Sequence, residues 1–132
     1  MIEFALLTTS LLFGGMILYA FGFAAFVFKA LPSDTAGPLI RRAFPHFYLF
    51  VFVTSGVATI TVGFSSDWLT TTLLFIIASS TVFARQVLMP AVNKATDAKK
   101  NIHFKILHSL AVLITVTQIL VSGAVIIRLA DL

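Results

Sequence analysis

The sequence predicts an all-α integral membrane protein, a four-transmembrane-helix bundle that runs up-down-up-down as a single domain over residues 1–132. Four stretches contain no charged residue, and they cover residues 4–28, 44–66, 68–84 and 106–127. About 20 apolar residues in a helix cross the hydrocarbon of a bilayer. Hydrophobic residues make up 59% of the chain and charged residues only 11%, against about 25% in soluble domains. A soluble fold of this composition would leave too much apolar surface exposed.

The four expected spans cover about residues 4–29, 44–65, 68–89 and 104–128. The first is expected to be a span and not a cleaved signal peptide, because it exceeds the ~7–15 apolar residues of a signal peptide and no basic segment precedes it. The second begins near Pro45, where the missing N–H is tolerated in a first helical turn. Pro90 is expected to bend or end the third span.

The distribution of lysine and arginine predicts the orientation. Eight of the nine basic residues flank the first and third connections, namely Lys29, Arg41, Arg42, Arg85, Lys94, Lys99, Lys100 and Lys105. Short loops rich in these residues stay on the cytoplasmic side. We therefore expect loops 30–43 and 90–103 to be cytoplasmic and both termini to lie outside, in a bacterial inner (plasma) membrane. The short connection around Asp67 makes spans two and three antiparallel neighbours.

Composition and motifs argue against several classes of function. The chain has no cysteine, which excludes disulfides, thiolate metal sites and a cysteine nucleophile, and no metal site is predicted. No Ser/His/Asp order, paired acids or phosphate-binding glycine loop is present, so we expect no enzyme and predict no catalytic residue. The net charge of +4 follows from membrane topology and not from nucleic acid. The expected partners are the lipid bilayer and, as an alternative, other membrane protein subunits.

Small residues recur at four-residue spacing in two of the spans. Gly14 follows Ser10 at this spacing, and Ser55, Thr59 and Gly63 repeat it in the second span. Small residues let helix backbones approach closely in lipid, where dispersion and interhelical hydrogen bonds hold helices together. We therefore expect Gly14, Ser55, Thr59 and Gly63 to lie at helix–helix contacts.

The polar groups that interrupt the spans fall at one depth. At 1.5 Å per residue, Arg85 lies about 26 Å along its helix from Trp68, near the cytoplasmic edge of the hydrocarbon. Spans two and four begin at the same level. The candidate ligand layer comprises Arg85, His108, His46, Tyr48, Asn93 and Ser109. Ionisable groups inside spans commonly mark function, and the alternative is an interfacial belt in which Arg85 reaches the headgroups.

Three short motifs in this layer resemble a known family. The second span opens with FPHFY (44–48), the third closes with ARQVLMP (84–90), and the fourth opens with FKILHS (104–109). In order and spacing they resemble the transmembrane protein 205-like family, whose members carry a four-span domain of unknown function. The resemblance implies the same fold and a site at these motifs, without an established reaction. The association of the eukaryotic member with platinum-drug resistance does not transfer easily, because this chain has no cysteine for a soft metal.

Three functions stay open on the sequence alone. The first is handling of a small solute or ion at the polar layer on the cytoplasmic side, where an anion would suit Arg85 and the basic rim. The second is an accessory or structural subunit of a larger membrane protein complex. The third is a b-type haem protein with His46 and His108 as axial ligands. We predict no cofactor, because Phe47 and Leu107 crowd a haem slot, and an absorption spectrum of the purified protein would test this.

Overall fold

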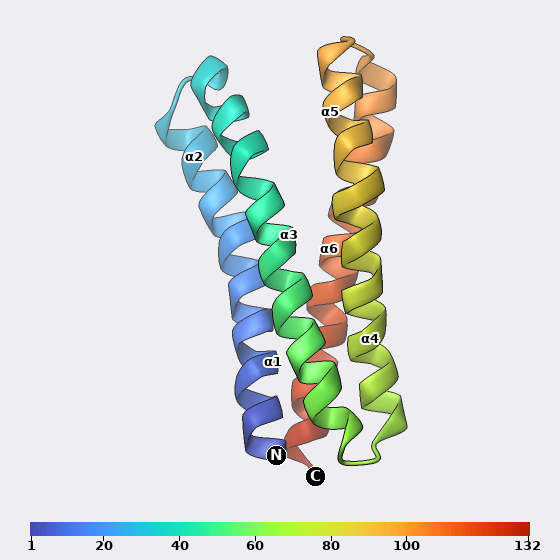
Figure 1. Cartoon of the computed structure of the whole chain (residues 1–132). Helices are drawn as coiled ribbons and strands as arrows, with labels where there is room; N and C mark the ends of the chain where they lie inside the picture. The colour runs from blue at the N-terminus through green and yellow to red at the C-terminus, as the bar shows by residue number, and fades with distance from the viewer.

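The computed structural model describes residues 1–132, which form helices joined by short connections, with no strand (Figure 1). In chain order the elements are α1 (Ile2–Ile17), η1 (Leu18–Phe23), α2 (Ala24–Ala30), α3 (Ser33–Gly63), α4 (Trp68–Phe83), η2 (Ala84–Leu88), α5 (Met89–Asp97) and α6 (Asn101–Ala130). The π-helical segments η1 and η2 each join two α-helices into one continuous rod. The chain therefore has four long helices, which confirms the predicted four-helix bundle.

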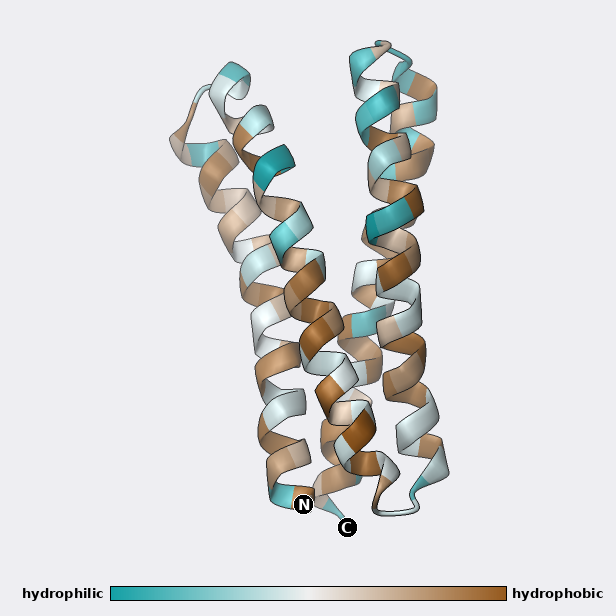
Figure 2. Cartoon of the chain, viewed as in Figure 1, coloured by the Kyte–Doolittle hydropathy of each residue, from teal (hydrophilic) through white to brown (hydrophobic).

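Each of the four rods is long and apolar enough to cross a bilayer. They have 29, 31, 30 and 30 residues, which corresponds to about 45 Å each, against about 30 Å for the hydrocarbon. Figure 2 shows apolar residues along most of each rod and a concentration of hydrophilic residues toward the end that lies away from the two termini. The protein is therefore an integral membrane protein whose helices are longer than the hydrocarbon is thick.

The helix α3 starts well before the second expected span, at Ser33, and contains both Pro38 and Pro45. A proline inside a helix removes the hydrogen bond to the carbonyl four residues earlier and pushes against that carbonyl. Those carbonyls belong to Asp34 and Arg41, and both residues are exposed, so water or headgroups can replace the missing bonds. The polar first third of α3 thus stays helical.

The third rod also continues past its proline, because α5 runs from Met89 to Asp97 with Pro90 in its first turn. The N–H of Met89 bonds to the carbonyl of Ala84, five residues earlier. The hydrogen-bond register has therefore already changed to the π pattern when the chain reaches Pro90. This change explains why the proline does not end the helix.

The two halves of the chain repeat the same order of elements. Both α1 and α4 have 16 residues, and each is followed by a π-helical segment and a short helix. The returning helices α3 and α6 have 31 and 30 residues. Tyr19 is the second residue of η1, and Arg85 is the second residue of η2. Since α1 packs on α6 and α4 packs on α3, the arrangement indicates two equivalent hairpins related by an approximate twofold axis.

The two hairpins meet at one end of the molecule and diverge at the other (Figure 1). We call the end with both termini and the turn 64–67 the terminal end, and the end with connections 31–32 and 98–100 the basic end. Toward the basic end, α2 packs on α3 and α5 packs on α6. There Arg41 of α3 donates two hydrogen bonds, of 2.7 and 2.9 Å, to the carboxylate of Asp97 in α5. This exposed ion pair bridges the diverging hairpins.

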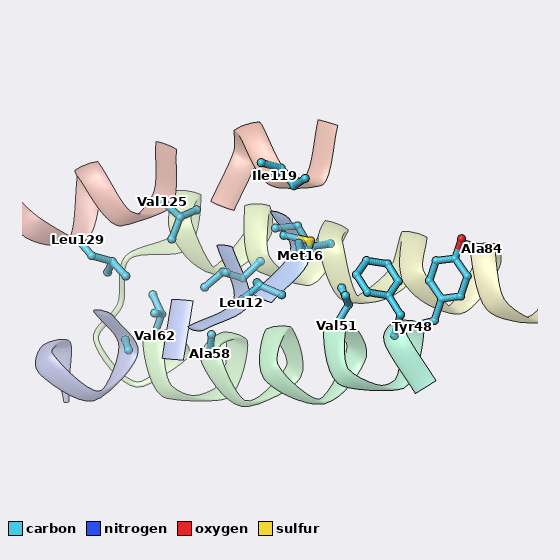
Figure 3. Close-up of a cluster of buried hydrophobic side chains, with 14 residues drawn as sticks. Leu12, Met16, Tyr48, Val51, Ala58, Val62, Ala84, Ile119, Val125 and Leu129 are labelled. Atoms are coloured by element: carbon cyan, nitrogen blue, oxygen red, sulfur yellow. The ribbon is translucent and has the colours of Figure 1, made fainter. Parts of the chain in front are cut away.

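The core shared by the two hairpins is built around α1. Leu12 and Met16 are fully buried between residues of α3, such as Ala58, and residues of α6, such as Ile119 and Val125 (Figure 3). In lipid the outside of the bundle is as apolar as its inside, so close packing, and not burial from water, holds these helices together. Substitutions that change side-chain volume in this core should therefore matter most.

Among the glycines, the closest contact with another helix falls at Gly15 and not at the expected Gly14. A methyl group added to Gly14 would meet no heavy atom within 4 Å, and the residue is exposed. A methyl group added to Gly15 would lie 2.5 Å from the ring of Phe50 in α3. The α1–α3 contact thus depends on the glycine one residue further along.

The small residues of α3 behave more nearly as expected. Ser55 is buried and donates to the carbonyl of Val51 at 2.6 Å, and Thr59 is half-buried and donates to the carbonyl of Ser55 at 2.7 Å. A methyl group added to Gly63 would lie 3.9 Å from Cγ2 of Thr71, an ordinary contact with α4. Because the hydroxyls bond within their own helix, the residues serve packing and not interhelical hydrogen bonding.

Candidate anion site beside Arg85

Arg85 is half-buried in η2, on the side of the second hairpin that contacts α3. Its Nε donates to the carbonyl of Pro45 at 3.2 Å, and its Nη1 donates to Oε1 of Gln86 at 3.1 Å. A guanidinium carries five N–H donors. These two hydrogen bonds hold the group in place between the hairpins and leave three donors for a further acceptor.

A groove between α3 and the third rod lies beside this guanidinium. It has a volume of about 270 Å³, and its lining consists of Leu49, Phe52, Thr81, Val82, Arg85 and Gln86. Half of these residues are apolar. The hydroxyl of Thr81 donates to the carbonyl of Ile77 at 2.7 Å and is not available to donate to a ligand. The groove therefore offers a ligand one cation and one amide, next to three apolar side chains.

Arg85 differs from the two arginines that make ion pairs. Arg41 pairs with Asp97, and Arg128 pairs with Asp67 at 3.1 Å. No carboxylate lies within 4 Å of the Arg85 guanidinium, whose two partners are uncharged. A charge near the hydrocarbon without a counter-ion is costly, so this arrangement favours an anionic ligand.

A second groove of comparable size, about 230 Å³, lies between α4 and α6 and contains no charged residue. Its polar members include Gln118 and Ser80, whose side chains bond to each other at 2.8 Å. Of these two grooves, the one beside Arg85 is therefore the one that combines a charge without a counter-ion with apolar lining residues.

The structure separates the six residues of the candidate layer. His46, His108 and Ser109 are exposed, and the ring of His108 stacks on Phe104 with centroids 5.3 Å apart. Asn93 is half-buried and makes no side-chain hydrogen bond to Arg85. The expected grouping of Arg85 with His108 and Asn93 is not formed: α6 contacts η2 as α3 does, but His108 is exposed on α6, whereas the Arg85 side chain bonds to α3.

Tyr48, the remaining member of the layer, belongs to a cluster of aromatic rings inside the first hairpin. It is buried and contacts Phe47 and Phe44, with centroids 5.3 and 6.2 Å away. Tyr19 of η1 joins this cluster and donates its hydroxyl to the carbonyl of Ala43 at 2.7 Å. Tyr48 is therefore a packing residue, and the π segments of both hairpins send a polar side chain to the same stretch of α3.

Sequence reasoning missed a buried polar side chain that connects two helices. Gln118 of α6 donates to Oγ of Ser80 at 2.8 Å, to Oγ1 of Thr81 at 3.0 Å and to the carbonyl of Ile77 at 3.3 Å. It is the one amide in the apolar stretch 106–127, and that exception was a signal available in the sequence. Its role is to hold α6 against α4.

A second unpredicted cluster fixes the terminal end of the molecule. Asp67 caps α4 by accepting from the N–H of Thr70, at 3.4 Å, and from its hydroxyl, at 2.7 Å. It also accepts from Nε and Nη2 of Arg128 at 3.2 and 3.1 Å. The hydrogen bonds from Arg128, and then those from Thr70, lower the pKa of Asp67 from 3.8 to about 2. One carboxylate thus ties the turn between the hairpins to the end of α6.

Comparison with known proteins identifies one family. A family model described as "Domain of unknown function (DUF4149)" matches residues 7–101, which run from within α1 to the first residue of α6 and include the residues around Arg85. No curated protein and no solved structure matches the chain.

Proposed function

Since the chain belongs to the DUF4149 family, a domain of unknown function, we propose a function from its own residues: it is a membrane protein that binds an anionic solute at Arg85. The observation that carries the proposal is a half-buried guanidinium, beside a groove, with three unused donors and no carboxylate partner. Arginine is suited to oxyanions because its planar fork matches carboxylate and phosphate oxygens.

The charge distribution supports an anion at this end of the molecule. Eight of the nine basic residues lie at or near the basic end, and Asp97 there is already paired with Arg41. A surface with an excess of one charge raises the local concentration of ligands of the opposite sign. The basic end thus attracts the class of ligand that Arg85 is equipped to bind.

We also propose that the protein lies in a bacterial inner membrane with its basic end in the cytoplasm, because short positively charged loops are not translocated. The proposal also includes the transmembrane protein 205-like assignment, which the motifs around Pro45, Arg85 and His108 support. A reporter that is active only in the cytoplasm should give no signal when fused after Leu132 and a strong signal when inserted at Lys99. The reverse pattern would overturn the orientation.

The anion site is tested with glycerol 3-phosphate, a soluble organic phosphate, and detergent-solubilised protein. We expect the melting temperature of the wild type to rise by a few degrees at a ligand concentration about tenfold above Kd, because a ligand of the folded state stabilises it. The Arg85→Gln variant should show no rise. Sodium chloride at matched ionic strength separates specific binding from screening.

The matched control for this test is Lys105→Gln, which removes the same charge from an exposed position of α6 at the same end of the molecule. It should retain the wild-type response. An equal response in Arg85→Gln, or an equal loss in Lys105→Gln, would show that the anion senses net charge and not the groove.

A further inference from the structure

The groove beside Arg85 opens sideways from the bundle. Its three apolar lining residues, Leu49, Phe52 and Val82, are 48%, 43% and 44% exposed, and all three belong to helices that cross the membrane. The groove is therefore accessible from the hydrocarbon. A soluble anion would have to leave water to fill it, whereas a membrane lipid would already lie beside it.

The order of residues along the groove follows the polarity of a lipid. The third rod runs from the terminal end to the basic end, so Arg85 and Gln86 lie nearer the basic end than Val82. In α3, which runs the opposite way, Phe52 lies nearer the terminal end than Pro45, whose carbonyl holds Arg85. The charged end of the groove is thus near the interface, and its apolar part continues toward the bilayer centre.

The size of the groove argues in the same direction. Pockets that enclose a drug-sized ligand have volumes of about 300–1,000 Å³. A groove of about 270 Å³ that is open along one side is too small to enclose such a solute. It suits a single acyl chain that lies against Leu49, Phe52 and Val82 while the rest of the molecule stays in the bilayer.

We infer that the anion bound by Arg85 is the headgroup phosphate of a phospholipid with net negative charge, and that one of the acyl chains of this lipid occupies the groove between α3 and α4. The inference rests on the proposed function and adds the ligand class to it. The free N–H donors of Arg85 bind the phosphate oxygens, and the amide of Gln86 is placed to donate to the same headgroup.

Native mass spectrometry of the detergent-solubilised protein tests this inference with three probes: phosphatidylglycerol, phosphatidylcholine with the same acyl chains, and glycerol 3-phosphate. We expect phosphatidylglycerol to bind at least tenfold more tightly than either of the others. Arg85→Gln should weaken its binding by about tenfold or more, which corresponds to the loss of a charge-assisted hydrogen bond. Arg85→Lys, which keeps the charge without the fork, should fall between the two.

A second variant tests the acyl-chain contact without touching the charge. Val82→Trp fills the groove and should weaken the binding of phosphatidylglycerol while leaving the binding of glycerol 3-phosphate unchanged. Val112→Trp, on an exposed face of α6 outside the groove, is the matched control and should change neither. Circular dichroism confirms that each variant is folded.

The outcomes distinguish the two proposals. Glycerol 3-phosphate could bind through Arg85 while phosphatidylglycerol binds no more tightly and its affinity is unchanged by Val82→Trp. In that case the site binds a soluble anion: the lipid inference is overturned and the proposed function stands. If no anionic probe depends on Arg85, both fail. If phosphatidylcholine binds as tightly as phosphatidylglycerol, the lipid inference also fails, because the headgroup charge then has no role.

Discussion

The Gly15→Leu substitution should lower the free energy of unfolding of the solubilised protein by about 2 kcal/mol or more, because inserting methylenes into a closely packed interface typically costs 1–3 kcal/mol. Even the first carbon of the new side chain would lie 2.5 Å from the ring of Phe50. A branched side chain cannot be placed there unless the Phe50 ring moves or α1 and α3 separate. Thermal or denaturant unfolding in detergent, followed by circular dichroism, measures the loss.

The neighbouring residue provides the control. Gly14→Leu makes the same chemical change at a position that meets no atom within 4 Å, so it should be neutral or stabilising by up to about 1 kcal/mol through helix propensity. The Phe50→Ala substitution, which removes the clashing ring, should restore part of the stability lost in Gly15→Leu. Equal effects of the two glycine substitutions would refute the α1–α3 contact described above.

The Asp67→Ala substitution should have the second large effect, a loss of about 2 kcal/mol. Removing a helix cap costs about 1 kcal/mol. The ion pair with Arg128 adds about another 1 kcal/mol at most, since the Arg128 side chain is 44% exposed and solvent screens the interaction. Asp67→Asn separates the two parts, because asparagine still caps the helix but lacks the charge, and should lose about half as much.

The same carboxylate gives a defined acid sensitivity. Its pKa is lowered from 3.8 to about 2, so its charge-dependent stabilisation is fully present above about pH 4 and is lost as the pH falls through 2. The wild type should therefore lose stability relative to Asp67→Asn as the pH decreases from about 4 to 2. Parallel pH profiles of the two proteins would contradict the assignment.

The ion pair at the other end of the molecule is the comparison for Asp67. Both side chains of the Arg41–Asp97 pair are exposed, at 42% and 62%, and Asp97 caps no helix start. Exposed pairs contribute about 0.2–1 kcal/mol. Asp97→Asn should therefore change the unfolding free energy by less than about 1 kcal/mol, and a loss as large as that of Asp67→Ala would mean that the basic end is also rigidly fixed.

Much of the fold could be predicted from the sequence, because the limits of the charge-free stretches depend only on composition. The turn at Asp67 and the antiparallel packing of α3 against α4 could likewise be predicted from the sequence. The extent of α3 could not be predicted, since a proline rule that considers only local hydrogen bonds starts the helix near Pro45, whereas the exposed residues at the basic end allow water or headgroups to replace the missing bonds and α3 starts at Ser33. Rules based on local sequence do not take into account the hydrogen bonds that water or headgroups provide.

The candidate site could be predicted only in part. The depth of Arg85 follows from counting residues, and this was sufficient to select it. Its partner could not be found in this way, because residues at one depth on neighbouring helices meet only if their side chains face each other. The helix α6 contacts both α5 and η2, but His108 is exposed and Arg85 bonds to α3, so equal depth did not bring the two together. The choice between Gly14 and Gly15 likewise depends on the rotation of α1, which a weakly amphipathic helix does not reveal.

The correspondence between the two π-helical segments has a consequence for binding stoichiometry. Two hairpins of the same construction offer two equivalent positions, but Tyr19 occupies the one in η1 and Arg85 the one in η2. The tyrosine is uncharged, and its hydroxyl donates a hydrogen bond to the carbonyl of Ala43 within its own hairpin. A molecule that is nearly symmetric in its backbone is therefore asymmetric in its chemistry, and it should bind one anion per chain instead of two.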